Sequence, residues 1–520
     1  MLINSKIIAT FILIIFAAIF SQEASCQSND QSVYTKAIEE HWRWNLDEAI
    51  TLYSKFISQK PAIAQPYFFR GSAYRSKGLD DQALADFEKA VEIDPNMAEA
   101  IFNKGQIYLK KRRFEKCLKD MTNLLDKSSS FPKAYSIRGE ANLGLSKFQE
   151  AINDFSKAIQ TEPNDFQIYF LRSLAYQSLN QPEKAMDDLD RSLQLNANNP
   201  LAWFRKGNLL FGAKDAKAAL SAYDKAISLE PNNAEFHNNR GFVNASLGNL
   251  ELALSDYSKA LDLEPRFERA LANRAETYSQ LGKNQEAFDD YDTLGKLVKS
   301  DAAIQVAKAE ILLRLGKTQD AINMLNQALS LKKDSTDIIA LRGQAYKLAD
   351  RCDKAVEDFG AVLKADPKDV ATLVDRGRCF LKLKQFKKCV SDLELAVKLD
   401  SRIASSEVLY DLAIANMMQK NYQAAIETFS RVIMLSPSNG LALANRGVAF
   451  KDSGKLEEAA RDFRNALALL EKPSSKEYTT KLLNETELAI KAKKPKTPLQ
   501  LLIGENVFPE SGSPSDTSWW

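Results

Sequence analysis

Apolar and polar positions recur along most of this chain with a period of 34 residues. When frames of 34 begin at Asp30, position 8 of each frame holds nothing larger than serine, and position 20 holds only alanine or cysteine. The pattern persists through thirteen frames, with two extra residues near Ser401–Ser405. Each frame also carries two apolar stripes at helical spacing, which a short turn separates. The pattern therefore predicts thirteen helical hairpins in series.

The small residues predict how the two helices of each hairpin pack. Small side chains at positions 8 and 20 allow two antiparallel helices to approach closely. A larger residue, most often aromatic or leucine, stands at position 24 and is expected to fill the remaining space. Seven frames end with a proline, which stops the second helix before the next hairpin begins. Since one hairpin cannot bury its apolar face alone, the hairpins are expected to stack on their neighbours.

These spacings resemble the tetratricopeptide repeat, whose small, aromatic and proline positions fall at the same places. The resemblance covers residues 30–472, which correspond to about thirteen tandem repeats. It implies an all-α fold, a right-handed α-solenoid superhelix of stacked antiparallel helical hairpins, whose first helices line a concave groove. Beyond the repeats, residues 474–491 are expected to form a capping helix over the last exposed face. Residues 492–520, rich in serine, proline and glycine, are expected to form a disordered tail.

Residues 1–26 predict a targeting segment. An uncharged, mostly apolar run at 7–20 follows Lys6, and it is shorter than the roughly 20 residues that a membrane-spanning helix needs. Small and polar residues then lead to Cys26, which is the pattern of a secretory signal peptide. Two alternatives stay open, namely lipidation of Cys26 and an uncleaved membrane anchor. In all three cases the rest of the chain is expected to be exported, whether secreted, periplasmic or held at the cell envelope.

Charge and composition argue against several classes of function. The 70 Lys and Arg nearly balance the 68 Asp and Glu, so the chain lacks the basic field that nucleic-acid binding requires. The two histidines stand far apart, with no metal-ligand spacing. The segment 207–212 opens like a phosphate-binding loop, but Ala213 replaces its lysine. We therefore predict no catalytic residue, no metal, no cofactor and no enzymatic activity.

Arginine at position 7 and aspartate at position 23 occur together. Position 7 holds arginine in eight frames, and all eight carry aspartate at position 23. These positions stand opposite each other in an antiparallel hairpin, so we predict a structural ion pair inside each hairpin rather than a ladder of anion-binding arginines. The predicted pairs are Arg70 with Asp86, Arg138 with Asp154, Arg172 with Asp188, Arg240 with Asp256, Arg274 with Asp290, Arg342 with Asp358, Arg376 with Asp392, and Arg446 with Asp462.

Two cysteines of one frame, Cys379 and Cys389, are expected to face each other across a hairpin. An exported chain can form disulfides. Helix axes that are about 8–10 Å apart rarely bring two Cα atoms within disulfide range, however. We expect two small core residues, and the sequence leaves open whether they oxidise.

The concave groove is where a ligand is expected. Positions 2, 5, 6, 9, 12 and 13 are not needed for hairpin packing, so they are expected to line it. Family members that bind chaperones hold a C-terminal carboxylate with lysine, asparagine and arginine. Asn208, Asn239 and Arg269 match three of the five elements of that pattern. The predicted peptide contacts are Phe204, Arg205, Asn208, Asn238, Asn239, Phe242, Arg269, Asn273 and Glu276. The alternative is a merely solvated concave face.

These observations favour a non-catalytic scaffold that binds an extended peptide or a helix of a partner protein in the groove. A membrane-tethered or lipidated assembly factor of a cell envelope is one alternative. An enzyme or a regulatory enzyme subunit is a second alternative, which the repeats disfavour because they account for nearly every residue. The sequence names neither the partner nor the oligomeric state.

Overall fold

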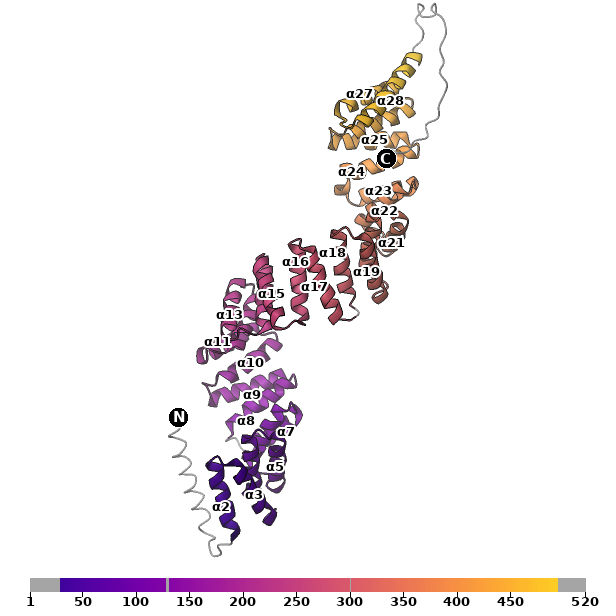
Figure 1. Ribbon diagram of the computed structural model, residues 1–520. Helices are drawn as coiled ribbons and strands as arrows, with labels where there is room; N and C mark the ends of the chain where they lie inside the picture. Colours follow the sequence, from indigo (N-terminus) through magenta and orange to yellow (C-terminus); the bar gives the residue numbers. More distant parts are fainter. Residues whose placement is uncertain (1–28, 128–130, 300, 494–520) are drawn as a thin grey trace, which may run out of the picture. The chain divides into compact units, whose positions relative to one another are not determined.

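The computed structural model describes residues 29–127, 131–299 and 301–493, and within these ranges every regular element is a helix. The chain divides into two compact units, Met1–Pro265 and Arg266–Trp520. In each unit, consecutive helices lie side by side in chain order (Figure 1). The predicted all-α fold of stacked helical hairpins is confirmed. The predicted targeting segment 1–26, with Cys26, lies outside the described residues. So does the predicted tail 492–520, except that residues 492 and 493 are the last two of the final helix and not part of a disordered tail.

The described part of the first unit contains seven hairpins. Its helices are α2 (Asn29–Trp42), α3 (Leu46–Gln59), α4 (Ala64–Ser76), α5 (Asp80–Ile93), α6 (Ala98–Lys110), α7 (Phe114–Lys127), α8 (Pro132–Gly144), α9 (Phe148–Thr161), α10 (Phe166–Ser178), α11 (Pro182–Leu195), α12 (Pro200–Gly212), α13 (Ala216–Leu229), α14 (Ala234–Ser246) and α15 (Leu250–Leu263). The principal helix contacts join elements that are next to each other, or next but one, in the chain.

The described part of the second unit contains six hairpins and a final helix. Its elements are α16 (Glu268–Gln280), α17 (Asn284–Leu297), α18 (Ala302–Arg314), α19 (Thr318–Leu331), α20 (Thr336–Leu348), α21 (Cys352–Ala365), α22 (Val370–Lys382), α23 (Phe386–Leu399), the 3-10 helix η2 (Ser401–Ile403), α24 (Ser406–Met418), α25 (Tyr422–Leu435), α26 (Gly440–Asp452), α27 (Leu456–Leu469) and α28 (Pro473–Lys493). Helix α28 packs on α27 and buries Thr479, Leu482 and Thr486. It corresponds to the capping helix expected at 474–491.

Every hairpin turns through one residue in the left-handed region, always at position 15 of its frame. At Gly78, for example, φ is 76°, and the next residue, Leu79, donates its N–H to the carbonyl of Tyr74 at 2.9 Å. This backbone bond closes the end of the first helix. The thirteen residues are Trp44, Gly78, Arg112, Ser146, Asn180, Lys214, Gly248, Gly282, Gly316, Asp350, Lys384, Lys420 and Gly454. Five are glycine, the residue that adopts this conformation without steric cost.

The seam between the two helices of a hairpin is built as the small positions predict. The position-20 residues are all completely buried: Ala49, Ala83, Cys117, Ala151, Ala185, Ala219, Ala253, Ala287, Ala321, Ala355, Cys389, Ala425 and Ala459. In the hairpin of α8 and α9, a Cβ atom added to Gly139 would lie only 2.7 Å from the Phe155 ring. The absence of a side chain at Gly139 therefore makes room for Phe155. Tyr291 differs from the other position-24 residues in being partly exposed.

All eight arginine–aspartate pairs form inside single hairpins, with two-pronged hydrogen bonding. In one of them, Arg138 donates from Nε to Asp154 Oδ2 at 2.9 Å and from Nη2 to Oδ1 at 2.7 Å. The other pairs repeat this geometry. Charge-assisted bonds of this kind fix both the distance and the register of two helices.

Five of these arginines also contact the preceding hairpin, which the sequence patterns did not indicate. The remaining guanidinium nitrogen, Nη1, donates to a polar residue at position 25 of the previous frame, at 2.7–2.9 Å. The bonds run from Arg70 to Ser54, Arg172 to Ser156, Arg240 to Asp224, Arg342 to Asn326 and Arg446 to Ser430. Where position 7 is lysine, Lys206 and Lys308 bind Asp190 and Asp292 of the previous hairpin. Position 7 therefore links consecutive hairpins as well as the two helices of one hairpin.

The expectation that Cys379 and Cys389 face each other is wrong. Cys379 lies against Cys352 in one hydrophobic cluster, whereas Cys389 belongs to the next cluster, with Leu393. The physical reason is that position 10 points toward the preceding hairpin and not across its own. The four described cysteines, Cys117, Cys352, Cys379 and Cys389, are buried free thiols.

We expect these four thiols to resist alkylation in the folded chain. Burial raises the pKa of Cys379 and of Cys389 to about 12, so at pH 8 only about one such thiol in 10⁴ is the reactive thiolate. Iodoacetamide at pH 8 should leave all four unmodified in the native chain and should modify all four in guanidinium, as measured by mass spectrometry of tryptic peptides. Rapid native labelling of Cys379 would contradict the packing described here.

Candidate functional site

Two open cavities lie next to each other on the first unit. One has a volume of about 560 Å³ and the other about 590 Å³, and both are lined by Gln106 and Ile137. The two cavities are therefore neighbours, and we call them together the α6–α8 groove. Its lining residues are Arg75, Phe102, Gln106, Leu109, Lys110, Arg112, Phe114, Lys133, Ser136, Ile137, Glu140, Leu143, Gly144, Thr161, Glu162, Pro163, Asn164, Asp165 and Leu171.

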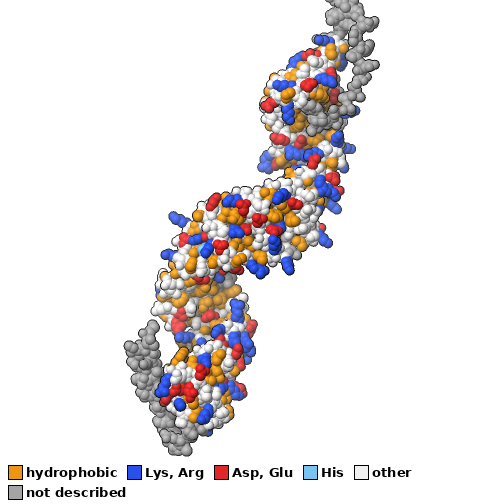
Figure 2. Space-filling model, in the orientation of Figure 1, with side chains coloured by type: hydrophobic (Ala, Val, Ile, Leu, Met, Phe, Trp, Pro, Cys, Tyr) orange, Lys and Arg blue, Asp and Glu red, His pale blue; other side chains and the backbone are white. Residues whose placement is uncertain are grey.

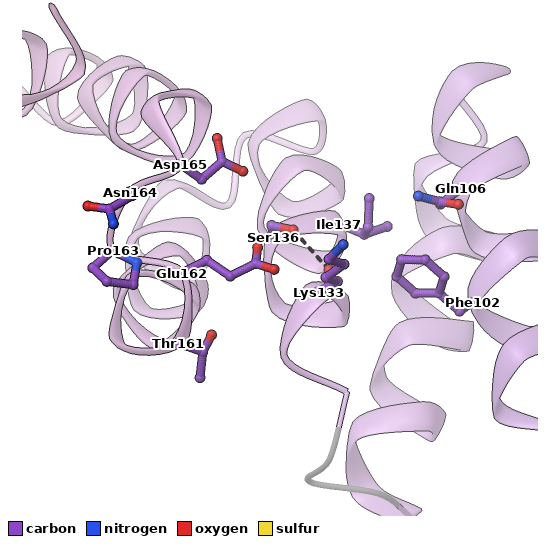
Figure 3. A pocket seen from close by; sticks show the side chains of 10 residues that line it. All are labelled: Phe102, Gln106, Lys133, Ser136, Ile137, Thr161, Glu162, Pro163, Asn164 and Asp165. Carbon is purple, nitrogen blue, oxygen red and sulfur yellow. Dashed lines mark hydrogen bonds between the residues drawn. The ribbon is translucent and has the colours of Figure 1, made fainter. Parts of the chain in front are cut away.

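The first cavity is formed by two first helices and one connector (Figure 3). Phe102 and Gln106 extend from α6 toward α8, and Glu162 reaches toward Ser136 from the other side. The connector is held in place because Asp165 caps α10 by accepting the N–H of Gln167 at 2.9 Å. This end of the groove therefore combines one aromatic wall with carboxylate groups.

The second cavity has an apolar floor. Leu109, Leu143 and Leu171 are half-buried there, on three consecutive first helices. The Phe114 ring, which lines the same cavity, lies against Gly144, where an added Cβ atom would approach the ring to 2.6 Å. Half-buried apolar side chains still present area to water, so a ligand that covers them gains hydrophobic free energy.

Glu140 lines this cavity together with the three leucines and has no partner among the described residues. Its half-buried carboxyl makes no hydrogen bond and no ion pair with any residue that the structure describes. Two basic side chains lining the same cavity are engaged elsewhere: Lys110 pairs with Asp80 at 2.5 Å, and Arg75 binds Asn103. Burial, with a smaller contribution from the negative charge of Asp165, raises the pKa of Glu140 to about 7. The groove thus holds a carboxyl group whose charge is not compensated.

The Glu140→Gln variant is expected to be more stable than the native chain at pH 8, by about 1–2 kcal/mol, and nearly unchanged at pH 5. The pKa of Glu140 is raised in the folded state to about 7. The folded chain therefore keeps a proton that the unfolded chain releases, and stability is lost as pH rises from about 4.5 to 7. Thermal unfolding at both pH values measures the difference. The exposed Glu150 of α9 supplies the control, because Glu150→Gln should shift neither midpoint, and equal gains at both pH values would contradict the prediction.

Six of the nine sequence-predicted contact residues lie on α12 and α14 of the first unit. Asn208 Oδ1 accepts hydrogen bonds from Tyr223 Oη at 2.6 Å and from Asn239 Nδ2 at 3.1 Å. Arg205 and Phe242 are exposed. Asn208 and Asn239 are half-buried, so all four of these residues keep some surface that a ligand could contact.

Two of the six correct the prediction. Phe204 is only 3 % exposed and stacks on Phe236 with ring centroids 4.8 Å apart, so it is a core residue. Asn238 is also buried, and its amide donates to Asn239 Oδ1 at 3.1 Å. Position 5 turns into the interface with the next hairpin at these two frames, which makes both side chains inaccessible to a peptide.

The remaining three predicted residues lie on α16 of the second unit. Arg269 is exposed, with its guanidinium 5.4 Å from the centre of the Phe267 ring. Glu276 accepts from Gln280 Nε2 at 3.3 Å, and Asn273 is half-buried. The structure therefore brings the nine residues together only as two groups, each within its own unit.

The α6–α8 groove uses the frame positions that the sequence indicated, but in other frames. Phe102, Ile137, Glu140 and Leu143 occupy positions 5, 6, 9 and 12. An acidic residue at position 9 among leucines at position 12 was the available signal. The predicted contacts were instead chosen by their match to the carboxylate-binding pattern of chaperone-binding family members, which favours asparagine and arginine.

Other kinds of site find no support in the described part of the chain. Between residues 29 and 493, apart from the undescribed gaps, no group of three or more His, Cys, Asp or Glu could hold a metal ion. None of the helices described above is both long and apolar enough to cross a bilayer. On the face drawn in Figure 2, basic and acidic side chains are interspersed with apolar ones.

Repeat-family models match several stretches of the chain. The model described as "TPR repeat" matches residues 71–111 and 207–248. Two models described as "Tetratricopeptide repeat" match 166–199, 234–267 and 302–335, and 407–437. All of these stretches lie within the thirteen frames.

Curated relatives match over short stretches. The chain is 38 % identical over 74 residues to a probable UDP-N-acetylglucosamine–peptide N-acetylglucosaminyltransferase SPINDLY of Solanum lycopersicum, covering 14 % of this chain and 8 % of that protein. It is 40 % identical over 63 residues to the SPINDLY protein of Petunia hybrida, covering 12 % and 7 %. The chain thus spans less than a tenth of these relatives.

Solved structures resemble the fold. PilF of Pseudomonas aeruginosa is 20 % identical, covers 42 % of this chain and 99 % of its own, and gives a TM-score of 0.37. A tetratricopeptide repeat protein of Parabacteroides merdae is 19 % identical, covers 48 % and 98 %, and gives 0.35. The Cut9–Hcn1 assembly is 15 % identical, covers 81 % and 96 %, and gives 0.34.

Proposed function

This chain is a tetratricopeptide repeat protein, and we propose that it is a non-catalytic scaffold whose α6–α8 groove binds an extended peptide segment of a partner protein. Proteins built from these repeats generally mediate protein–protein interaction. The observation that carries the proposal is the pair of neighbouring cavities that share Gln106 and Ile137 as lining residues. Concave, partly apolar surfaces with a few polar groups are the usual form of a binding site.

The shape of the groove favours an extended segment over a globular surface. Three successive first helices, α6, α8 and α10, each contribute a leucine to the lining of one cavity, namely Leu109, Leu143 and Leu171. An extended chain that crosses these helices would place successive side chains on one helix after another. Ile137 lies where the two cavities meet, so a ligand filling both would pass over it.

The experiment that tests this function is selection of binding peptides from a random displayed library with the full chain. We expect the selected peptides to bind an Ile137→Arg variant at least about tenfold more weakly, because a charged side chain would then obstruct the centre of the groove. Leu252→Arg, at a leucine that is 60 % exposed on α15, is the matched control and should bind as the native chain does. Circular dichroism should show that both variants are folded. Selected peptides that bind Ile137→Arg and native chain equally would refute the groove as the site.

The short matches to SPINDLY proteins are no basis for proposing glycosyl transfer. They cover less than a tenth of those proteins. We propose no enzymatic activity for this chain, and an activity that survives purification to homogeneity would overturn that proposal.

We also propose that the chain is exported. The uncharged run at residues 7–20, followed by small and polar residues up to Cys26, supports this proposal. Mass spectrometry of the chain purified from its own cells would distinguish a cleaved segment, a lipidated Cys26 and an intact anchor. An intact N-terminus on a chain recovered from the cytosol would contradict export.

A further inference from the structure

We infer that the partner segment carries a lysine or arginine side chain that pairs with Glu140 and is flanked by apolar residues. This inference rests on the proposed function, since it specifies the chemistry of the peptide that the α6–α8 groove takes. The occupant is a segment of another protein, with a basic residue between aliphatic or aromatic ones.

The first step is that Glu140 forms no ion pair with any lysine or arginine in the described part of the chain. A half-buried carboxylate among leucine side chains is costly to ionise unless an opposite charge or hydrogen-bond donors compensate it. In this cavity Lys110 is committed to Asp80 and Arg75 to Asn103. A basic side chain supplied by a ligand would provide the opposite charge that the Glu140 carboxylate lacks.

The second step concerns the other charged groups of the groove, because its lining holds four basic residues and three acidic ones. Asp165 and Glu162 line the adjoining cavity, and Asp165 acts electrostatically on Glu140. Lys133 and Arg112 lie on the groove as well, on α8 and on the turn after α6. Arg75 and Lys110 are bound to other residues, and neither Arg112 nor Lys133 forms an ion pair with Glu140 among the described residues. The carboxyl group of Glu140 therefore remains available to a basic side chain of a ligand.

The third step is a comparison with the same frame position elsewhere. In the hairpin of α22 and α23, position 9 is Arg378, and its guanidinium Nε binds Asp411 Oδ2 of the next hairpin at 2.9 Å. In the hairpin of α12 and α13, position 9 is Asn208, which accepts two hydrogen bonds. In those two frames the polar residue at position 9 therefore has hydrogen-bond partners within the protein. Glu140, at the same position of its own frame, lines the open cavity and has no such partner among the described residues.

The apolar part of the inference follows from the floor. Leu109, Leu143 and Leu171 line the same cavity as Glu140, and Phe102 lines the neighbouring cavity. A small cation or a polyamine would leave these side chains exposed, whereas a peptide with apolar residues on each side of its basic residue would cover them.

The experiment uses one peptide selected with the full chain at pH 7.5, in two forms. The second form replaces its arginine with citrulline, which keeps the shape and removes the charge, or its lysine with norleucine. We expect the native chain to bind the neutral form about tenfold more weakly, as for a partly buried charge pair. The Glu140→Gln variant should bind both forms equally, and Glu150→Gln should behave as the native chain does.

The outcomes separate this inference from the proposed function. Selected peptides without a basic residue, or an equal loss from the neutral form in native chain and Glu140→Gln, would overturn the pairing with Glu140, even if Ile137→Arg still abolished binding. Peptides whose binding ignores Ile137→Arg would instead refute the groove itself. Thermal unfolding of each variant, measured alongside binding, shows whether a loss of binding is due to loss of the fold.

Discussion

Replacing Phe155 with alanine is expected to destabilise the hairpin of α8 and α9 by about 3–5 kcal/mol. The Phe155 side chain is completely buried, and Gly139 opposite it carries no side chain that could move into the cavity. The surrounding hairpins are held by their own seams, so collapse around the vacated volume is restricted. Amide hydrogen exchange in α8 and α9 measures the loss, because an array of repeats need not unfold in one step.

The control for this prediction is an exposed apolar residue in the same unit. Leu252→Ala, at a side chain that is 60 % exposed, should change protection by no more than about 0.5 kcal/mol. If the amide hydrogens of α8 and α9 exchanged at the same rates in Phe155→Ala and in Leu252→Ala, the Phe155 ring would not be what stabilises the packing of the two helices.

The second large effect is expected at the aspartate of an arginine pair. Asp154→Ala should destabilise the same hairpin by about 3 kcal/mol, because Arg138 would keep its charge in a mostly buried position without a partner. The Asp154 side chain is only 5 % exposed, and it also accepts a hydrogen bond from Asn142 Nδ2 at 3.0 Å. The variant therefore leaves two buried donors unsatisfied at once.

A double variant distinguishes the loss of the pair from the unpaired charge that remains. Arg138→Met combined with Asp154→Leu should be less destabilised than Asp154→Ala alone, since no buried charge is left. The exposed pair of Lys89 and Glu92, 2.9 Å apart, is the matched control. Glu92→Ala should cost less than about 1 kcal/mol. Equal losses from Asp154→Ala and Glu92→Ala would show that these pairs act only as surface bridges.

The contacts between the two helices of a hairpin could be predicted from the sequence because both partners of each contact lie within one 34-residue frame. Gly139 and Phe155 stand 16 residues apart, as do Arg138 and Asp154, so one frame contains both partners of each contact. A contact that lies within one frame can recur from frame to frame, as the arginine–aspartate pair does in eight of them, and this recurrence makes it recognisable in the sequence.

Contacts between hairpins were less visible because different residues make them in different frames. The partner of Arg70 in the previous hairpin is Ser54, that of Arg342 is Asn326, and Lys206 binds Asp190. No single residue type marks position 25. The contact between Cys379 and Cys352 was missed for the same reason, since it crosses from one frame to the next.

The α6–α8 groove shows how far a binding site can be predicted from the sequence pattern. Frame positions predicted which side chains of the first helices face inward, and the groove residues on α4, α6, α8 and α10 obey that rule. Arg112, Phe114 and the connector residues up to Asp165 lie outside the predicted positions. The uncompensated state of Glu140 depends on Lys110 being held by Asp80, which lies in the preceding hairpin. Whether a charge is neutralised depends on such pairings, which a pattern of residue types does not specify.

The extra residues at Ser401–Ser405 show where this architecture tolerates a change in length. They fall in η2 and its flanks, so α23 and α24 keep the 14 and 13 residues of their counterparts. One residue inserted within a helix would instead rotate all later side chains by about 100° and carry the small ones off the seam. Evolution can therefore lengthen such a protein at the joints between hairpins, or by duplicating a whole repeat, while the interior of each helix stays fixed in phase.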